Sequence, residues 1–463
     1  MKPATLEEAE SNTFVVAEAD GAPAGGGEGE ESRRRFDGRW LYWASKGTLA
    51  VLDQALLSGS NFALSVLLAR WLQEEEYGAY VVTFSVFILL GTVHQALLLV
   101  PSLVLGNTLY RERRRGYFGA LIRLHILLSV IFSTALAVTA AGFWWIAPEG
   151  HMASSFAGLT LALPCVLLYW LARTAPYLDF QPEMAVVGGL AYCVVLLGGV
   201  FLLRQWELLS ALTGFAAMAL SSLSFSAVLL WRLKPIVWSE QGRVSAREVW
   251  RSSWVYGRWE LAIAVSLWLP AFLCYPLTAG IVGASGAGAL RAMHNLALPV
   301  GHAVTAVLRL AQPYVSAHFG RGGQGSTARS VQRLALLGMT GTSAYVLVVS
   351  VFREPIMAAF YGGKFQEAVA LVPWMLVTTV FWAGVEGLGV GLRAMRSSRS
   401  LFLAYLAASA FFLVVGAPAA LAAGLAGVVA TMAATSGVAL VTIAFLFKRE
   451  AAAQRETLES AEA

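Results

Sequence analysis

The sequence predicts an all-α polytopic membrane protein, with about twelve transmembrane helices in two six-helix halves around a central cavity. Hydrophobic residues make up 57% of the chain and charged residues only 13%, far from the roughly 45–50% and 25% of soluble domains. Apolar segments recur that are long enough to cross a hydrocarbon layer about 30 Å thick. Arginine and lysine collect in every second connection, as they do on the cytoplasmic side of membrane proteins.

The first hairpin, residues 58–106, is the clearest element. Apolar runs at 58–72, extendable back to Thr48, and at 79–105 flank the acidic turn 73–78. Arg70 is the only positively charged residue beside this turn. Because connections poor in lysine and arginine face away from the cytoplasm, we expect the turn on the non-cytoplasmic side.

Ten further apolar segments bring the predicted number of spans to twelve. They lie near residues 118–146, 154–176, 184–203, 207–231, 255–277, 287–316, 331–352, 368–392, 400–416 and 419–447. The six-helix halves therefore cover residues 39–232 and 255–447. Between them, residues 233–254 interleave arginines with tryptophans, which predicts an amphipathic cytoplasmic linker lying in the membrane interface.

Both ends of the chain are expected in the cytoplasm. Residues 1–38, rich in Ala, Gly and Glu, predict a disordered tail, and residues 448–463 form a second tail. The predicted cytoplasmic side carries 24 lysines and arginines, and an odd number of spans would break this asymmetry. The other side carries four, namely Arg70, Arg204, Arg353 and Lys364.

Composition also excludes several classes of function. The net charge of +5 is concentrated at membrane edges, where it sets orientation, so we expect no nucleic-acid partner. Cys165, Cys193 and Cys274 are too few and too scattered for a disulfide framework or a metal site. The sequence contains no GxxxxGK[ST] phosphate loop, and we expect no bound cofactor.

The stretch ALLSGSNFALSVLLARWLQEEEYGAYVVTFSVF resembles the opening hairpin of the polysaccharide-type flippases of the multidrug/oligosaccharidyl-lipid/polysaccharide (MOP) transporter superfamily. The similar features are Arg-Trp-Leu, an acidic run and Tyr-Gly-Ala-Tyr. The resemblance implies a twelve-helix transporter, not an enzyme, in the bacterial cytoplasmic membrane. It also implies that a polyprenyl-pyrophosphate-linked oligosaccharide crosses the bilayer by alternating access through a cationic cavity, with a polysaccharide polymerase or transferase as a further partner.

Two alternatives stay open. An ion-coupled multidrug or cation antiporter of the same superfamily would have a cavity dominated by acidic residues rather than by arginine and histidine. A membrane glycosyltransferase or polymerase usually needs a large catalytic loop outside the membrane. The longest predicted outer connection runs only from Arg353 to Glu367, which favours a transporter.

The eighth predicted span has the sharpest polar pattern. At about 100° per residue, Arg291, Asn295, His302 and Arg309 fall within about 40° of one another, and His294 lies on the adjoining face. A charged side chain at the bilayer centre costs about 2.5–3.5 kcal/mol on insertion scales. This stripe is therefore a candidate substrate-binding wall of the cavity. The alternative is that the two arginines snorkel to opposite headgroup layers.

Four further residues are candidates for substrate binding. Arg123, Arg173 and Arg258 lie just inside their spans on the predicted cytoplasmic side, and a guanidinium fork suits a pyrophosphate. Snorkelling explains each of these arginines equally well. Asn61 belongs to a neutral polar stripe of the first span with Gln54, Ser58 and Ser65, which fits either a sugar-facing wall or helix packing.

Three carboxylates inside predicted spans need partners. Asp53, Glu260 and Glu386 are each a candidate site for coupling to H⁺ or Na⁺, or half of a structural ion pair. Glu386 and Arg393 lie within about 20° on one helix face, although two turns separate them.

Overall fold

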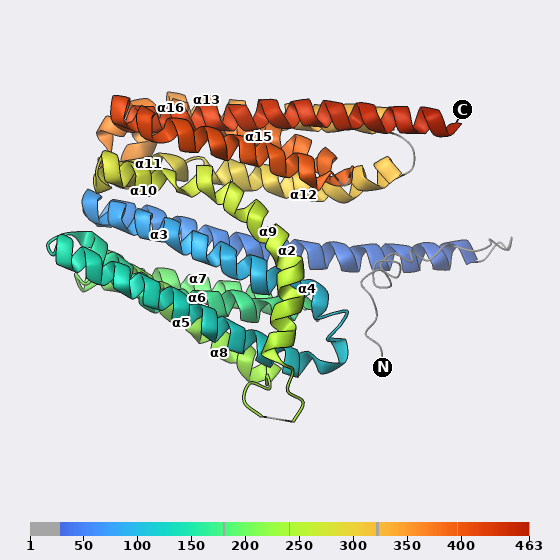
Figure 1. Ribbon diagram of the computed structural model, residues 1–463, viewed down its shortest axis with the longest axis horizontal. Coiled ribbons are helices and arrows are strands. Elements are labelled where there is room, and N and C mark those ends of the chain that lie inside the picture. Colours follow the sequence, from blue (N-terminus) through green and yellow to red (C-terminus); the bar gives the residue numbers. More distant parts are fainter. Residues whose placement is uncertain (1–27, 179–180, 240, 321–323, 396, 463) are drawn as a thin grey trace. The chain divides into compact units, whose positions relative to one another are not determined.

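The computed structural model describes residues 28–178, 181–239, 241–320, 324–395 and 397–462. The chain divides into two units, Met1–Thr48 and Leu49–Ala463. Within the described ranges the protein is helical, without any strand (Figure 1). This confirms the predicted all-α class.

The helices of the first half end near residue 233 and those of the second half begin with α9. The first half contains α2 (Glu28–Trp71), α3 (Glu74–His94), the π-helix η1 (Gln95–Leu99), α4 (Val100–Leu105), the short η2 (Arg111–Arg113), α5 (Arg114–Ile146), α6 (His151–Leu178), α7 (Pro182–Gln205) and α8 (Ala211–Leu233). The second half contains α9 (Ala246–Phe272), α10 (Cys274–Ile281), α11 (Ala284–Asn295), α12 (Leu298–Gly320), α13 (Gln324–Val351), α14 (Arg353–Tyr361), η3 (Gln366–Leu371), α15 (Val372–Ala394) and α16 (Ser398–Glu462).

Ten stretches of the described residues are long and apolar enough to cross a membrane. The last stretch, Arg399–Gln454, contains both final predicted spans. The backbone leaves the helical region at Ala423 and Gly424, which divides this stretch into two helices. The eighth predicted span is divided between α11 and α12 and is not among the ten. With these two cases, each of the twelve predicted spans has a helical counterpart.

The structure differs from the predicted boundaries in both tails. Helix α2 begins at Glu28, so residues 28–38 are helical rather than disordered, while residues 1–27 of the expected tail lie outside the described residues. At the other end, α16 continues to Glu462 instead of ending near residue 447.

The central linker also differs from its prediction. An interfacial helix was expected over residues 233–254, but the described residues of 234–245 form an irregular connection. Helix α9 begins only at Ala246 and continues directly into the seventh span. The arginine and tryptophan pattern near residue 250 therefore belongs to the first turns of a transmembrane helix.

Side chains from α5 hold this irregular linker. Arg123 donates hydrogen bonds to the carbonyl oxygens of Val237 and Val244, both at 2.5 Å. Arg115 donates from Nε to the carbonyl oxygen of Lys234 at 2.8 Å. Since irregular backbone has lost its helical donors, these guanidinium groups satisfy carbonyls that would otherwise lack partners.

Three apolar cores define how the halves pack. The largest joins both halves and includes Tyr80 and Phe215 of the first half with Leu290 and Met357 of the second. A second core contains only residues of the second half, such as Val385 and others on α12, α13, α15 and α16. The third core belongs to the first half, the linker and the start of α9. The second core therefore stays within its half, whereas the third also includes the start of α9, which packs on η1, α4 and α5.

The shared core extends through the first half as far as Leu229 of α8 and reaches the end with the predicted non-cytoplasmic turns. It includes Leu72 and Tyr77, which flank the first turn, and Phe365 beside the turn after α14. Helices α3, α10 and α11 form this junction between α5–α8 and α13, α15 and α16 (Figure 1). The protein is therefore closed at its predicted outer end.

One glycine allows the closest approach at this junction. A Cβ atom on Gly78 of α3 would lie 1.8 Å from the carbonyl oxygen of Ala284, at the start of α11. Real Cβ contacts are never this short, so any side chain at residue 78 would push the two halves apart.

Candidate functional site

Asn295 lies at the centre of a buried polar network between the halves. Its side chain is fully buried, and its amide nitrogen donates to the Ser65 hydroxyl at 3.1 Å and to the Tyr77 hydroxyl at 3.4 Å. The two hydroxyls lie 3.0 Å apart. The network links α2, α3 and α11. Asn295, predicted as a cavity residue, is thus part of the closed junction.

Arg291 is buried one turn earlier on α11, with 8% of its surface exposed. The centre of its guanidinium lies 5.6 Å from the Phe84 ring centroid and 5.8 Å from that of Tyr275. Nη1 donates to the Tyr275 hydroxyl at 3.4 Å. Among the described residues, no carboxylate pairs with Arg291. Aromatic faces partly compensate its charge.

His294 belongs to the same cluster. Its Nδ1 lies 2.6 Å from the Tyr275 hydroxyl, and the two rings are stacked with centroids 6.3 Å apart. Tyr275 therefore connects Arg291 and His294, although the helical angles had placed His294 outside the main stripe.

The stripe predicted on the eighth span is not continuous. Helix α11 ends at Asn295 and α12 begins at Leu298. Pro299 explains the break, because it lacks the N–H that would bond to the Asn295 carbonyl and its ring would clash with that oxygen. The prediction of one straight polar face from Arg291 to Arg309 is therefore wrong at this bend.

Beyond the bend the surroundings change. Helix α11 packs on α3 of the first half, whereas α12 packs on α13 and α15 of its own half. His302 and Arg309 on α12 are exposed, in contrast to Arg291 and Asn295. The two ends of the predicted stripe thus differ in access to solvent or lipid.

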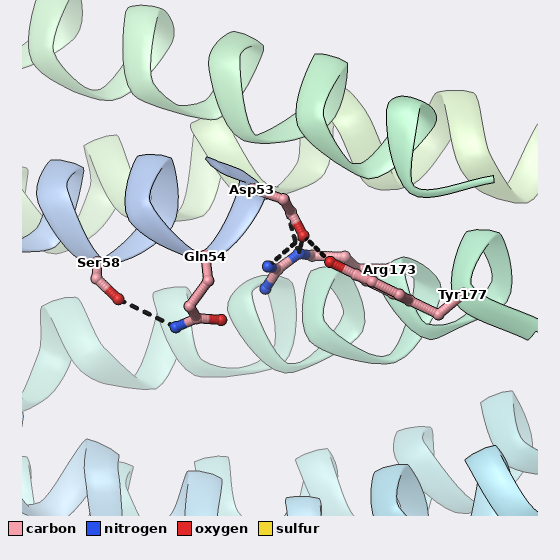
Figure 2. Close-up of polar contacts among 5 residues, drawn as sticks. All are labelled: Asp53, Gln54, Ser58, Arg173 and Tyr177. Carbon is pink, nitrogen blue, oxygen red and sulfur yellow. Dashed lines mark hydrogen bonds and ion pairs between the residues drawn. The ribbon is translucent and has the colours of Figure 1, made fainter. Parts of the chain in front are cut away.

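Asp53 of α2 forms an ion pair with Arg173 of α6. Arg173 Nε and Nη2 lie 2.9 Å and 2.5 Å from Asp53 Oδ2, and the Tyr177 hydroxyl donates to the same oxygen. Figure 2 shows both side chains of α6 meeting the carboxylate of α2. The guanidinium predicted to meet a pyrophosphate is thus occupied by a carboxylate, and Asp53 is fully buried.

The neutral polar stripe of the first span divides among different neighbours. Gln54 donates to Ser58 at 3.0 Å on the exposed side (Figure 2). Asn61 donates to the Leu57 carbonyl at 2.9 Å and accepts from the Tyr192 hydroxyl at 3.3 Å. These contacts agree with the helix-packing interpretation of the stripe.

Two further cationic candidates are not brought together with the junction. Arg123 binds the linker carbonyls described above. Arg258 is exposed on α9, and its guanidinium lies 5.6 Å from the Trp259 ring centroid. Arg123, Arg173 and Arg258, all placed on the predicted cytoplasmic side, therefore each contact different groups.

The other two acidic candidates have unlike surroundings. Glu386 lies 3.4 Å from Arg393 and accepts from the Tyr405 hydroxyl at 3.4 Å, so the predicted pairing is present. Glu260 is exposed on α9, and no hydrogen bond or ion pair links it to another residue within the described ranges.

Polar contacts seal the predicted outer end. Arg70 donates to the Ala359 carbonyl at 2.6 Å, and Lys364 donates to the Arg70 carbonyl at 2.9 Å. The backbone N–H of Phe365 donates to Glu74 at 3.2 Å. Burial lowers the pKa of Lys364 from its ordinary value, although nearby Glu74 opposes this shift. These residues connect the first outer turn to the turn after α14.

Sequence reasoning missed a buried histidine pair. His94 Nε2 lies 3.1 Å from His125 Nδ1, and both side chains are buried. His94 precedes the π-helix η1, which no sequence pattern had indicated. The available signal was the presence of one histidine in each of two neighbouring apolar spans, where polar groups are costly.

The fold is that of MOP superfamily transporters. An inward-facing multidrug resistance MATE family transporter of the MOP superfamily matches with a TM-score of 0.72 at 13% identity, over 87% of this chain and 96% of the other. The lipid II flippase MurJ, in an inward closed conformation, matches with a TM-score of 0.65 at 13% identity, over 86% of this chain and 89% of the other.

A MOP superfamily transporter from Pyrococcus furiosus has the same fold, with a TM-score of 0.63 at 11% identity over 90% of this chain and 95% of that one. Its structure is described as having a binding pocket of reverse polarity, which suggested a different function. No protein-family model matches the sequence, and no curated protein matches it. At 11–13% identity, these likenesses show the fold.

Proposed function

We propose that the protein is a flippase that moves a polyprenyl-pyrophosphate-linked oligosaccharide across a bacterial cytoplasmic membrane by alternating access, for cell-surface or exopolysaccharide synthesis. The observation that carries this proposal is Arg291. It is buried at the junction of the halves, between Phe84 and Tyr275, without a carboxylate partner among the described residues. Such a cation suits an anionic headgroup, because a guanidinium offers two parallel hydrogen bonds to a phosphate.

The distribution of carboxylates supports an anionic substrate. Asp53 is paired with Arg173, and Glu386 with Arg393. A cation antiporter needs carboxylates that are free to bind its substrate. Glu260 is exposed and is the remaining candidate for H⁺ or Na⁺ coupling; it is also the feature that favours multidrug or cation antiport as the second function.

The arrangement of the cores supports alternating access. The largest core, which both halves share, reaches the predicted outer end, a second core lies within the second half, and the second half contributes only the start of α9 to the third core. We propose that the headgroup enters from the cytoplasmic side, passes Arg309 and His302 on α12, and reaches Arg291 as the outer seal opens. A polysaccharide polymerase or transferase would then receive the glycan.

The test is export of the lipid-linked glycan by variants at matched membrane abundance. Arg291→Lys keeps the charge but loses the fork, so we expect partial loss, and Arg291→Ala should lose more. Arg309→Ala should impair export without changing abundance, since its side chain is exposed. Arg399→Ala, which changes an exposed arginine in the first turn of α16, is the control and should export normally.

Normal export by both alanine variants would contradict an anion path along α11 and α12. Loss of cation efflux instead of glycan export, specifically in Glu260→Gln, would favour the antiporter. The two assays together therefore separate the two functions.

A further inference from the structure

The first half contains a cavity that is separate from the residues of the proposed transport path. Its volume is about 260 Å³, and it lies where the ends of α5, α6 and α8 meet. The side chains that matter here are Arg114, Arg115, Phe118, Leu178, Arg232 and Leu233. None of the path residues on α11 or α12 lines it.

The charge of this cavity is strongly positive. Three of its lining residues are arginines, and none is a carboxylate. Arg115 uses Nε for the linker carbonyl of Lys234. Arg232 is exposed, and its Nη1 lies 3.5 Å from the Met184 sulfur, a weak acceptor. Since a guanidinium has five N–H donors, Arg115 and Arg232 keep donors for an anion beyond these contacts.

The other wall of the cavity is apolar. Phe118, Leu178 and Leu233 line it beside the arginines. The three helices end here on the side that the lysine and arginine count assigns to the cytoplasm. Basic pockets between transmembrane helices on that side bind the headgroups of anionic lipids. A free phosphate would use the arginines but would gain nothing from the apolar wall.

We propose that this cavity binds the phosphate of an anionic phospholipid from the cytoplasmic leaflet, with the start of an acyl chain against the apolar wall. The cavity lies beside the start of the linker between the halves. Arg115 accepts the Ile236 N–H at its carbonyl while its side chain donates to Lys234. A lipid held here would steady the point at which the linker leaves α8.

The experiment measures lipid retention by the full-length protein after delipidation. Purified protein is titrated with phosphatidylglycerol or phosphatidylcholine and analysed by native mass spectrometry. We expect preferential retention of phosphatidylglycerol. Arg232→Gln should weaken it about fivefold, the effect of one basic residue at an anionic surface, and Arg232→Lys should weaken it less. Arg111 is an exposed arginine of η2, just before α5, and does not line the cavity. The control variant Arg111→Gln should therefore bind the lipid as the wild type does.

Three results would overturn the proposal. The first is equal retention of the two lipids, and the second is an equal loss in Arg232→Gln and Arg111→Gln. The third is full displacement of phosphatidylglycerol by equimolar glycerol phosphate or by a polyprenyl pyrophosphate, which would assign the cavity to a free phosphate or to the transported lipid.

A second measurement keeps the test independent of variant folding. Photoreactive phosphatidylglycerol is crosslinked to the wild-type protein, and the modified peptides are mapped. Crosslinks at residues 114–118 and 229–235 support the site. Crosslinks confined to other helices contradict it.

Discussion

Asp53 of α2 and Arg173 of α6 form a bidentate ion pair, in which both Nε and Nη2 of the guanidinium bond to the carboxylate. The Asp53 side chain is fully buried and that of Arg173 is 13% exposed. Because the Tyr177 hydroxyl also donates to this carboxylate, protonation of Asp53 would sacrifice several contacts at once. The pair therefore favours a structural role for Asp53 over ion coupling.

Removing this charge should destabilise the protein. Asp53→Asn leaves Arg173 without its counter-charge, and breaking a buried pair costs about 3–5 kcal/mol. We expect a loss near the lower limit because Arg173 is partly exposed. Thermal unfolding in detergent measures it, with Gln54→Ala, an exposed neighbour, as the control. Restored stability in the double variant Asp53→Asn/Arg173→Gln would support the ion pair. If Asp53→Asn were stable but unable to transport, Asp53 would instead be a coupling residue.

The two remaining acidic candidates should behave differently. Glu386→Gln breaks the contact with Arg393 and should lower membrane abundance and transport together. Glu260→Gln removes a charge that has no partner among the described residues and should leave abundance unchanged. Quantitative immunoblotting beside a transport assay checks both variants. A parallel fall of abundance in Glu260→Gln would contradict this distinction.

Thiol access should differ across the bend in the eighth span. In a background lacking the three native cysteines, Cys at residue 302 should react with a water-soluble reagent, because His302 is exposed. Cys at residue 295 should react slowly, since Asn295 is fully buried. Unfolded protein labelled at both positions is the control. Equal rates in the folded protein would show that the outer junction is open or that residue 302 faces lipid.

Topology can be tested with a reporter that is active only outside the cytoplasm. Fusions after Glu75 or Gly362 should be active, because these connections have few lysines and arginines. Fusions after Arg114 or Ser397 should be silent. Activity after Arg114 would contradict the twelve-span arrangement.

The linker should loosen when its main donor is removed. Arg123→Ala loses the bonds to the carbonyls of Val237 and Val244, so limited proteolysis between residues 234 and 245 should become faster. Arg247→Ala, an exposed arginine at the start of α9, should be cut at the wild-type rate. Unchanged proteolysis of Arg123→Ala would mean that the apolar core alone holds the linker.

The sequence was sufficient for the helices because membrane crossing depends on length and hydropathy, which are local properties. It also located the pairing of Glu386 with Arg393, since both lie on one helix face. The Asp53–Arg173 pair joins residues 120 positions apart, and no spacing rule relates them. The hydrogen bonds from Arg123 to the linker carbonyls could not be predicted either, because every residue has a backbone carbonyl and the sequence does not show which ones accept.

The bend at Pro299 shows a second kind of limit. The angles between Arg291 and Arg309 were calculated for a straight helix. The sequence shows Pro299, but the direction in which a proline bends a helix depends on how the two segments pack. Helix α11 follows the first half and α12 the second. The predicted linker helix failed for a related reason, because its arginine and tryptophan pattern fits the end of a membrane-spanning helix equally well.

The core shared by the two halves has a consequence for temperature. If the outer end opens, apolar residues such as Tyr80, Leu290 and Met357 exchange contact with each other for contact with water. Exposure of apolar surface to water carries a positive change in heat capacity, so the equilibrium between the closed and open states should curve with temperature. Cooling weakens apolar association, and the second core, which lies within the second half, does not contribute to this curvature. The equilibrium between the closed and open states should therefore shift on cooling through the core that the halves share.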